Sequence, residues 1–174
     1  MRTDRVEPPA VPIVDWHPYP SEARSLPSAY LHAGHLYASA TPSRVSTILG
    51  SCVAVALFDP SAQIGGLNHF LLPVGPEQGV PSPRFGNVAV PWLVESLLSA
   101  GARRNRLQAK LFGGASMLRA FRTTGGHLGQ KNVAMARAML LEECIPIVAE
   151  DVDGERGRKL IFHTHDGSAW VRSL

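Results

Sequence analysis

The chain contains few cysteines, and it has no long apolar run. Only Cys52 and Cys144 occur among its 174 residues, which is too few for the disulfide framework of a small secreted domain. No segment approaches the run of about 20 apolar residues that a membrane-spanning helix needs, and the first residues lack the apolar core of a secretory signal. We therefore expect a cytoplasmic protein that does not insert into a membrane.

Aromatic residues and net charge are also low. Aromatic side chains make up 7% of the chain, and the formal net charge is +3. The arginines gather near 103–106 and 156–158, where solvated surface is the simplest interpretation. A protein that binds nucleic acid needs a denser basic stripe with interleaved aromatic residues. We therefore expect no nucleic-acid partner.

Two regions of different composition divide the chain. Residues 1–33 are rich in proline, which removes backbone donors and fixes φ, so they are expected to form an extended arm. The chain as a whole is 45% hydrophobic and 18% charged, which is typical of globular proteins. Residues 34–174 are expected to form a single domain.

Hydrophobic periodicity predicts both helices and strands in this domain. Helical spacing of apolar residues predicts helices over 88–102 and 133–144, the second with Asn132 as its N-terminal cap. Alternating or continuous apolar runs predict strands over 35–40, 44–50, 52–59, 64–73, 106–114, 146–151, 159–165 and 169–174. This order predicts an α/β or α+β sheet with helices packed on one face.

The two cysteines stand in different surroundings. Cys144 ends a helical pattern that leads into an apolar run, which favours a small buried hydrophobe. Cys52 stands between the Gly50-Ser51 turn and an apolar strand, where a side chain can be held rigidly and still face a cleft. Backbone N–H groups at such a turn can point at a developing oxyanion. Cys52 is therefore the candidate nucleophile.

His69 lies on the next expected strand, which returns antiparallel to the first. An imidazole beside a thiol can take its proton and so activate it for attack on a carbonyl. From spacing alone, however, a cysteine before an apolar strand is more often a core residue than a nucleophile. A histidine in an apolar strand is likewise more often buried and satisfied. The pairing of Cys52 with His69 is therefore a weak signal by itself.

His163 and His165 alternate on one expected strand and so share a face. This spacing leaves a two-histidine metal site open, but no third ligand is evident in the sequence.

The segment LGSCVAVALFDPSAQIGGLNHFLLP (49–73) closely resembles the signature of the chemoreceptor glutamine deamidase family, CheD. The resemblance continues in the same order through GARRNRLQAKLFGGASM (101–117), LGQKNV (128–133) and IPIVAEDVDGERGRKLIF (145–162). It covers residues 34–165. Several blocks that match together are far more specific than any one of them.

The resemblance implies roles for named residues. The nucleophilic cysteine of the family falls on Cys52 and its catalytic histidine on His69. The family has a hydroxyl residue six positions before the cysteine, where this chain has Ser46, with Thr47 next to it. The backbone around Gly50 and Ser51 would hold the oxyanion. The loop that carries Gly113, Gly114 and Ser116 would shape substrate access.

The resemblance also implies a fold, an activity and partners. The fold would be a layered α/β/β sandwich with two main helices packed on a mixed sheet. The activity would be hydrolysis of selected glutamines to glutamates on methyl-accepting chemotaxis receptors through a thioester, and also hydrolysis of glutamate methyl esters. No metal or organic cofactor is required. The alternative function is that of a weakly catalytic or non-catalytic regulator, which binds receptors or the chemotaxis phosphatase CheC.

Overall fold

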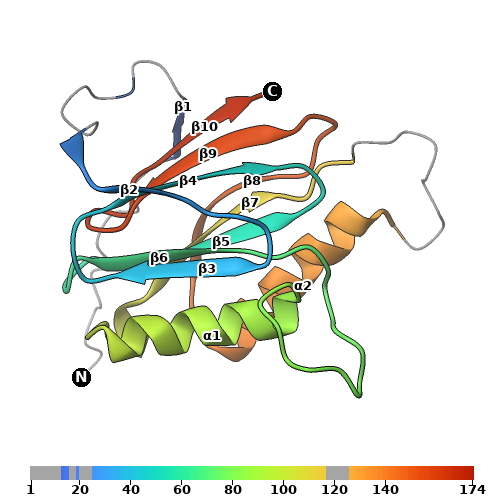
Figure 1. Ribbon diagram of the computed structural model, residues 1–174, viewed down its shortest axis with the longest axis horizontal. Helices are drawn as coiled ribbons and strands as arrows, with labels where there is room; N and C mark the ends of the chain where they lie inside the picture. The colour runs from blue at the N-terminus through green and yellow to red at the C-terminus, as the bar shows by residue number, and fades with distance from the viewer. Residues whose placement is uncertain (1–12, 16–18, 20–24, 117–125) are drawn as a thin grey trace, which may run out of the picture.

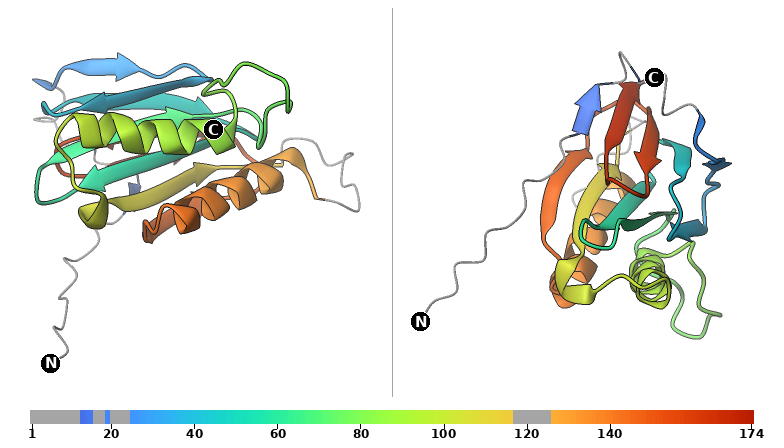
Figure 2. Two further views of the ribbon diagram at one scale, coloured as in Figure 1. Left: turned by 90° about the horizontal axis from the view of Figure 1, so that it is seen from below. Right: turned by 90° about the vertical axis from the view of Figure 1, so that its left-hand side faces the viewer.

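The computed structural model describes residues 13–15, 19, 25–116 and 126–174. Two stacked β-sheets form two layers, and two helices cover the outer face of one of them (Figure 1). Figure 2 shows both helices on the same side of the paired sheets. The expected α/β/β sandwich with two main helices is therefore confirmed.

Each sheet has five strands. The sheet far from the helices has the order β1-β10-β9-β4-β2, and the sheet next to the helices has the order β3-β6-β5-β7-β8. The pairs β1–β10, β2–β4 and β7–β8 are parallel and the others antiparallel, so both sheets are mixed. The strands span Ile13–Asp15 (β1), Ser28–Tyr30 (β2), His35–Ser39 (β3), Arg44–Leu49 (β4), Val53–Asp59 (β5), Ile64–His69 (β6), Gln108–Gly113 (β7), Ile147–Val152 (β8), Arg158–His163 (β9) and Ala169–Ser173 (β10).

Strand β5 is apolar from Val53 to Phe58 because both of its faces are covered. Val53, Val55 and Leu57 pack in the core that lies toward the helices, whereas Ala54 and Ala56 pack in the core between the two sheets. Alternate residues of a strand point to opposite faces. The even-numbered residues of β5 therefore line the space between the sheets. The same alternation determines which side chains near β5 can face that space.

The helices begin earlier than their apolar patterns predict. Helix α1 spans Gly86–Ser99 and helix α2 spans Leu128–Glu142, and a short 3₁₀ helix, Arg104–Arg106, follows α1. The N-cap of α2 is His127, whose side chain accepts a hydrogen bond from the backbone of Gln130. The expected cap at Asn132 is wrong, because this residue lies inside the helix and is fully buried. None of the described helices is long and apolar enough to cross a bilayer.

Cys144 also differs from its expected position. It lies just beyond α2 with a positive φ of 55°, and it is exposed rather than buried. The helix ends at this turn, so the residue points outward before the chain enters β8. Its thiol forms no disulfide.

Parts of the proline-rich arm add edge strands to the outer sheet. Strand β1 pairs with β10, and β2 pairs with β4. Residues 1–12, 16–18 and 20–24 of the expected arm lie outside the described residues. The division at residue 34 remains a prediction.

Candidate active site

Cys52 lies in the turn between β4 and β5, at one end of the layer between the two sheets. Its side chain is half-buried and packs against the core between the sheets. The turn is fixed by two backbone bonds from the loop after β7: the N–H of Gly114 donates to the carbonyl of Cys52, and the N–H of Ala115 donates to that of Gly50, each at 2.8 Å. The thiol is thus held by a rigid backbone and is not sealed in the interior.

The glycines expected to shape access pack against this turn. Gly113 has a φ of +105°, and a Cβ atom there would lie 2.2 Å from the Cys52 carbonyl oxygen, so only glycine fits. Gly114 has a φ of +71°. Ser116 lies farther out, half-buried, where its N–H donates to the Gly154 carbonyl and where it lines a cleft of about 420 Å³. The structure therefore gives Gly113 a packing role, and the access role of this loop remains a prediction.

His69 ends strand β6 and is buried. The antiparallel register runs from Ala56 opposite Leu67 to the bridge between Val53 and Phe70, which places Ala54 opposite His69. Directly opposed residues share a face, and so do residues two apart on one strand. Cys52 and His69 are therefore diagonal neighbours on the face between the sheets, with Cα atoms about 7–8 Å apart in such a pair.

Thr47 supplies the hydroxyl that contacts His69. Its Oγ1 lies 2.8 Å from His69 Nδ1, and it donates to the Leu31 carbonyl at 2.7 Å. A hydroxyl has a single proton. Because that proton goes to Leu31, Oγ1 must accept from Nδ1–H of His69. The imidazole is thereby held in the tautomer that leaves Nε2 unprotonated.

The second ring nitrogen of His69, Nε2, differs from Nδ1. It is buried and has no hydrogen-bond partner among the described residues. An unprotonated ring nitrogen on the same face as a thiol is what a general base for that thiol requires. Among the described residues, no hydrogen bond joins the Cys52 thiol to this nitrogen.

Ser46, the residue expected to orient the histidine, lies on the other face of β4. It is half-buried and stands opposite Ile161 of β9 and Tyr30 of β2 in the outer sheet. Its neighbour Thr47 is fully buried and points toward His69. Strand alternation allows only one of two adjacent residues to reach the inner face. The hydroxyl is therefore displaced by one residue from its expected position.

Both reactive groups are neutral at rest. Burial lowers the pKa of His69 to about 4, against a smaller opposing effect of the Leu31 backbone. Burial raises the pKa of the Cys52 thiol above its ordinary value, and its own backbone N–H opposes part of this rise. The resting pair is thus a thiol and an imidazole rather than an ion pair.

Asn132 is a site residue that the sequence analysis did not identify as such. From inside α2, its Nδ2 donates to the carbonyls of Ser51 at 3.0 Å and of Leu71 at 2.9 Å. It thereby ties the turn that holds Cys52 to the end of the chain segment that carries His69. The sequence signal for this role is weak. It consists of an asparagine near the expected start of the helix, and an asparagine there is also typical of an N-terminal cap.

The backbone donors near Cys52 are available. Within the part of the chain that the structure describes, the N–H groups of Ser51 and Cys52 donate to no carbonyl or side-chain oxygen. The carbonyls of the same turn are all engaged, those of Gly50 and Cys52 by the β7 loop and that of Ser51 by Asn132. The turn therefore presents donors, not acceptors, beside the sulfur.

We expect Thr47→Val to lower kcat/KM by about 10- to 100-fold, because the near-isosteric valine removes the acceptor that fixes the His69 tautomer. Thr47→Ser keeps the hydroxyl and is expected to restore most of the activity. Ser46→Ala is the matched control and is expected to remain within about twofold of the parent. Ring ¹⁵N shifts of His69 would report the tautomer directly. A loss in Ser46→Ala with no loss in Thr47→Val would contradict this assignment.

Comparison with known proteins gives one family. Residues 71–173 match the family model described as CheD chemotactic sensory transduction. That match begins after Cys52 and His69. Two relatives are similar over most of their length. The "Probable chemoreceptor glutamine deamidase CheD 1" of Anaeromyxobacter dehalogenans is 57% identical over 83% of this chain and 84% of its own. The "Probable chemoreceptor glutamine deamidase CheD" of Sulfurimonas denitrificans is 41% identical over 82% and 92%.

Among solved structures, the chain matches the Neisseria meningitidis protein NMB0706, described with the family model DUF152. The TM-score is 0.43 and the sequence identity 13%, over 76% of this chain and 64% of that protein.

Proposed function

This chain belongs to the CheD family, and we propose that it hydrolyses glutamine side chains to glutamate on bacterial chemoreceptors, with Cys52 as nucleophile and His69 as general base. The relatives' names supply the substrate class. The arrangement of Cys52, His69 and Thr47 supplies a mechanism that suits it. The setting would be the cytoplasm, where the signalling regions of such receptors lie.

The first half of the reaction forms a thioester. Cys52 Sγ attacks the side-chain carbonyl carbon of glutamine while its proton passes to Nε2 of His69. The carbonyl oxygen gains negative charge, which the N–H groups of Ser51 and Cys52 are placed to stabilise. The imidazolium then gives its proton to the amide nitrogen, the C–N bond breaks, and ammonia leaves.

The second half releases glutamate. A water molecule attacks the thioester carbonyl as Nε2 of His69 takes one of its protons. The C–S bond breaks, the Cys52 thiolate recovers that proton from the imidazolium, and the new carboxylic acid ionises. A glutamate methyl ester would follow the same path with methanol in place of ammonia. His69 carries the protons exchanged between Cys52, the leaving group and water, and the carboxylic acid proton passes to solvent, so this route uses neither a metal nor an organic cofactor.

One observation carries this proposal: Thr47 holds His69 in the tautomer whose free nitrogen faces the same layer as Cys52. A merely buried histidine would be expected to satisfy both ring nitrogens. The alternative, a regulator that binds receptors or a CheC phosphatase without catalysis, would not require this arrangement.

The direct test is to incubate the purified full chain with cytoplasmic fragments of the receptors from the same organism. Peptide mass spectrometry should detect conversion of particular glutamines to glutamate, and ammonia should be released in equal amount. Receptor or CheC binding in a pull-down, together with unchanged glutamines, would overturn the enzyme proposal in favour of the regulator. Activity only on glutamines of unrelated proteins would instead identify a more general amidase.

A further inference from the structure

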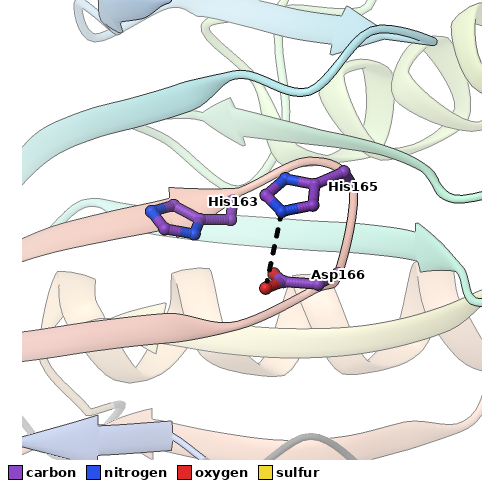
Figure 3. Close-up of side chains that lie close together, drawn as sticks. All are labelled: His163, His165 and Asp166. Atoms are coloured by element: carbon purple, nitrogen blue, oxygen red, sulfur yellow. Dashed lines mark ion pairs between the residues drawn. The ribbon is translucent and has the colours of Figure 1, made fainter. Parts of the chain in front are cut away.

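A second cluster of reactive side chains lies at the far end of the sandwich from Cys52. Strand β9 begins at Arg158, which stands opposite Leu49 next to the nucleophile turn, and it ends at His163. The β9–β10 hairpin there brings together His163, His165 and Asp166, one potential ligand atom from each lying within 4.8 Å of the others (Figure 3). The proposed deamidation uses none of these three residues.

His163 is fixed in place as metal-binding histidines commonly are. It is buried, and its Nε2 lies 2.8 Å from the Tyr19 hydroxyl. A ligating imidazole usually has its second nitrogen hydrogen-bonded, which sets the tautomer and the ring orientation. Figure 3 shows the remaining nitrogen, Nδ1, on the side of Asp166.

Asp166 has one oxygen engaged and one directed to the cluster. Its Oδ1 accepts hydrogen bonds from the backbone N–H of Ser168 at 2.9 Å and from the Ser168 hydroxyl at 2.5 Å. Its Oδ2 lies 3.7 Å from Nε2 of His165, which is too long for a hydrogen bond. The other nitrogen of His165, Nδ1, is buried and has no hydrogen-bond partner among the residues that the structure describes. Asp166 Oδ2 and the ring nitrogens of His165 are thus close together but form no hydrogen bond with one another.

We propose that His163, His165 and Asp166 bind one divalent transition-metal ion, for which Zn²⁺ is the best match. Zinc takes imidazole nitrogen and carboxylate oxygen at about 2.0–2.2 Å, and three protein ligands leave a fourth position for water. Ligand atoms in such a tetrahedral site are about 3.3 Å apart. The widest separation in the cluster therefore has to contract by up to about 1.5 Å, which His165 and Asp166 can supply because both lie in the turn and are partly exposed.

The surrounding charge argues for a selective site of modest affinity. Arg44 stands opposite His163 on β4 and is close enough to disfavour positive charge on it. The Lys110 ammonium donates to the Gly167 carbonyl at 2.7 Å, next to Asp166. Both cations oppose a dication, and the single carboxylate of Asp166 offsets only one of these two positive charges. Mg²⁺ and Ca²⁺, which need several oxygen ligands, are therefore excluded, whereas ions that bind imidazole are retained.

A bound metal ion would cross-link the three side chains of this turn. It would close the β9–β10 turn and, through His163, fix the ring that Tyr19 of the arm contacts. Because the ion binds the folded hairpin and not the unfolded chain, it raises thermal stability by mass action. The expected consequence is a zinc-dependent rise in Tm of about 5–10 °C at a hundredfold excess over Kd.

The test is titration of EDTA-treated full-length protein with Zn²⁺ by calorimetry, in a Cys52→Ala/Cys144→Ala background that removes thiol ligands. One ion per chain is expected to bind, and His165→Ala or Asp166→Asn should each weaken binding by at least about tenfold. Asp166→Asn retains an oxygen for Ser168, so its effect cannot be attributed to loss of the turn. His35→Ala, which removes an exposed histidine elsewhere, is the matched control.

Two further measurements decide the outcome. Tyr19→Phe should weaken binding by about tenfold without removing a ligand, and the Tm rise should vanish in His165→Ala. The proposal is overturned if the background protein shows no binding with Zn²⁺ at about 100 μM, or if both ligand variants bind as tightly as the background. Because the background lacks Cys52, either result leaves the proposed deamidase function untouched.

Discussion

Replacing Cys52 with alanine is expected to abolish glutamine conversion, with kcat/KM falling by at least about 10⁴-fold. In the proposed mechanism, the sulfur of Cys52 forms and breaks the covalent bond between enzyme and substrate. The turn itself should persist, because its hydrogen bonds come from the backbone of Gly114 and Ala115 and from Asn132. Peptide mass spectrometry of a receptor fragment, incubated with parent and variant side by side, measures the effect.

The chain offers its own control for this experiment. Cys144 is the other free thiol and is exposed beyond α2, so Cys144→Ala should leave kcat/KM unchanged. A further variant, Cys52→Ser, keeps the shape but not the acidity of the side chain and should be strongly impaired. Receptor binding should survive in Cys52→Ala. Full activity in Cys52→Ala would exclude the thioester route.

The sequence predicted the layers of the fold better than the contacts of the site. Strands and helices are predicted from periodicities that span many residues. Errors of a few residues at their ends therefore do not change the predicted architecture. The starts of the helices were wrong for a local reason: the first turn of α2, Leu128-Gly129-Gln130, has no apolar pattern. It is placed by packing, because Gly129 allows a close approach to the Gly114 carbonyl. Such tertiary contacts leave no periodic signal.

The site shows the same limit on a smaller scale. The pairing of Cys52 with His69 could be predicted from the hairpin register and the resemblance. The orienting hydroxyl could not be placed by counting back from Cys52, because a shift of one residue on β4 moves a side chain to the opposite face. Thr47 reaches the inner layer and Ser46 does not. Likewise, the sequence indicated His163 and His165 as possible metal ligands but not Asp166. The hairpin turn places Asp166 beside them in the structure.

His69→Gln is expected to lower kcat/KM by about 10²- to 10⁴-fold, the usual contribution of a general base. Glutamine can still hydrogen-bond Thr47 but cannot take the Cys52 proton and return it. Because burial lowers the pKa of His69 to about 4, the base is unprotonated at all higher pH values. In the parent protein, kcat/KM should therefore fall on acidification only near pH 4. A histidine with the ordinary pKa of about 6.5 would make it fall near that pH instead.

The rate at which iodoacetamide alkylates Cys52 distinguishes this neutral pair from a preformed thiolate–imidazolium pair. Only the thiolate reacts, and burial raises the Cys52 pKa. In a Cys144→Ala background, alkylation should therefore be slow at neutral pH and rise about tenfold per pH unit up to about pH 9. An ion pair would instead give a fast plateau between about pH 5 and 8. Since His69 does not hold the thiolate at rest, His69→Gln should leave this alkylation profile almost unchanged while it removes catalysis. If His69→Gln abolished both catalysis and the alkylation of Cys52 at neutral pH, the imidazole would have to ionise Cys52 before substrate binds.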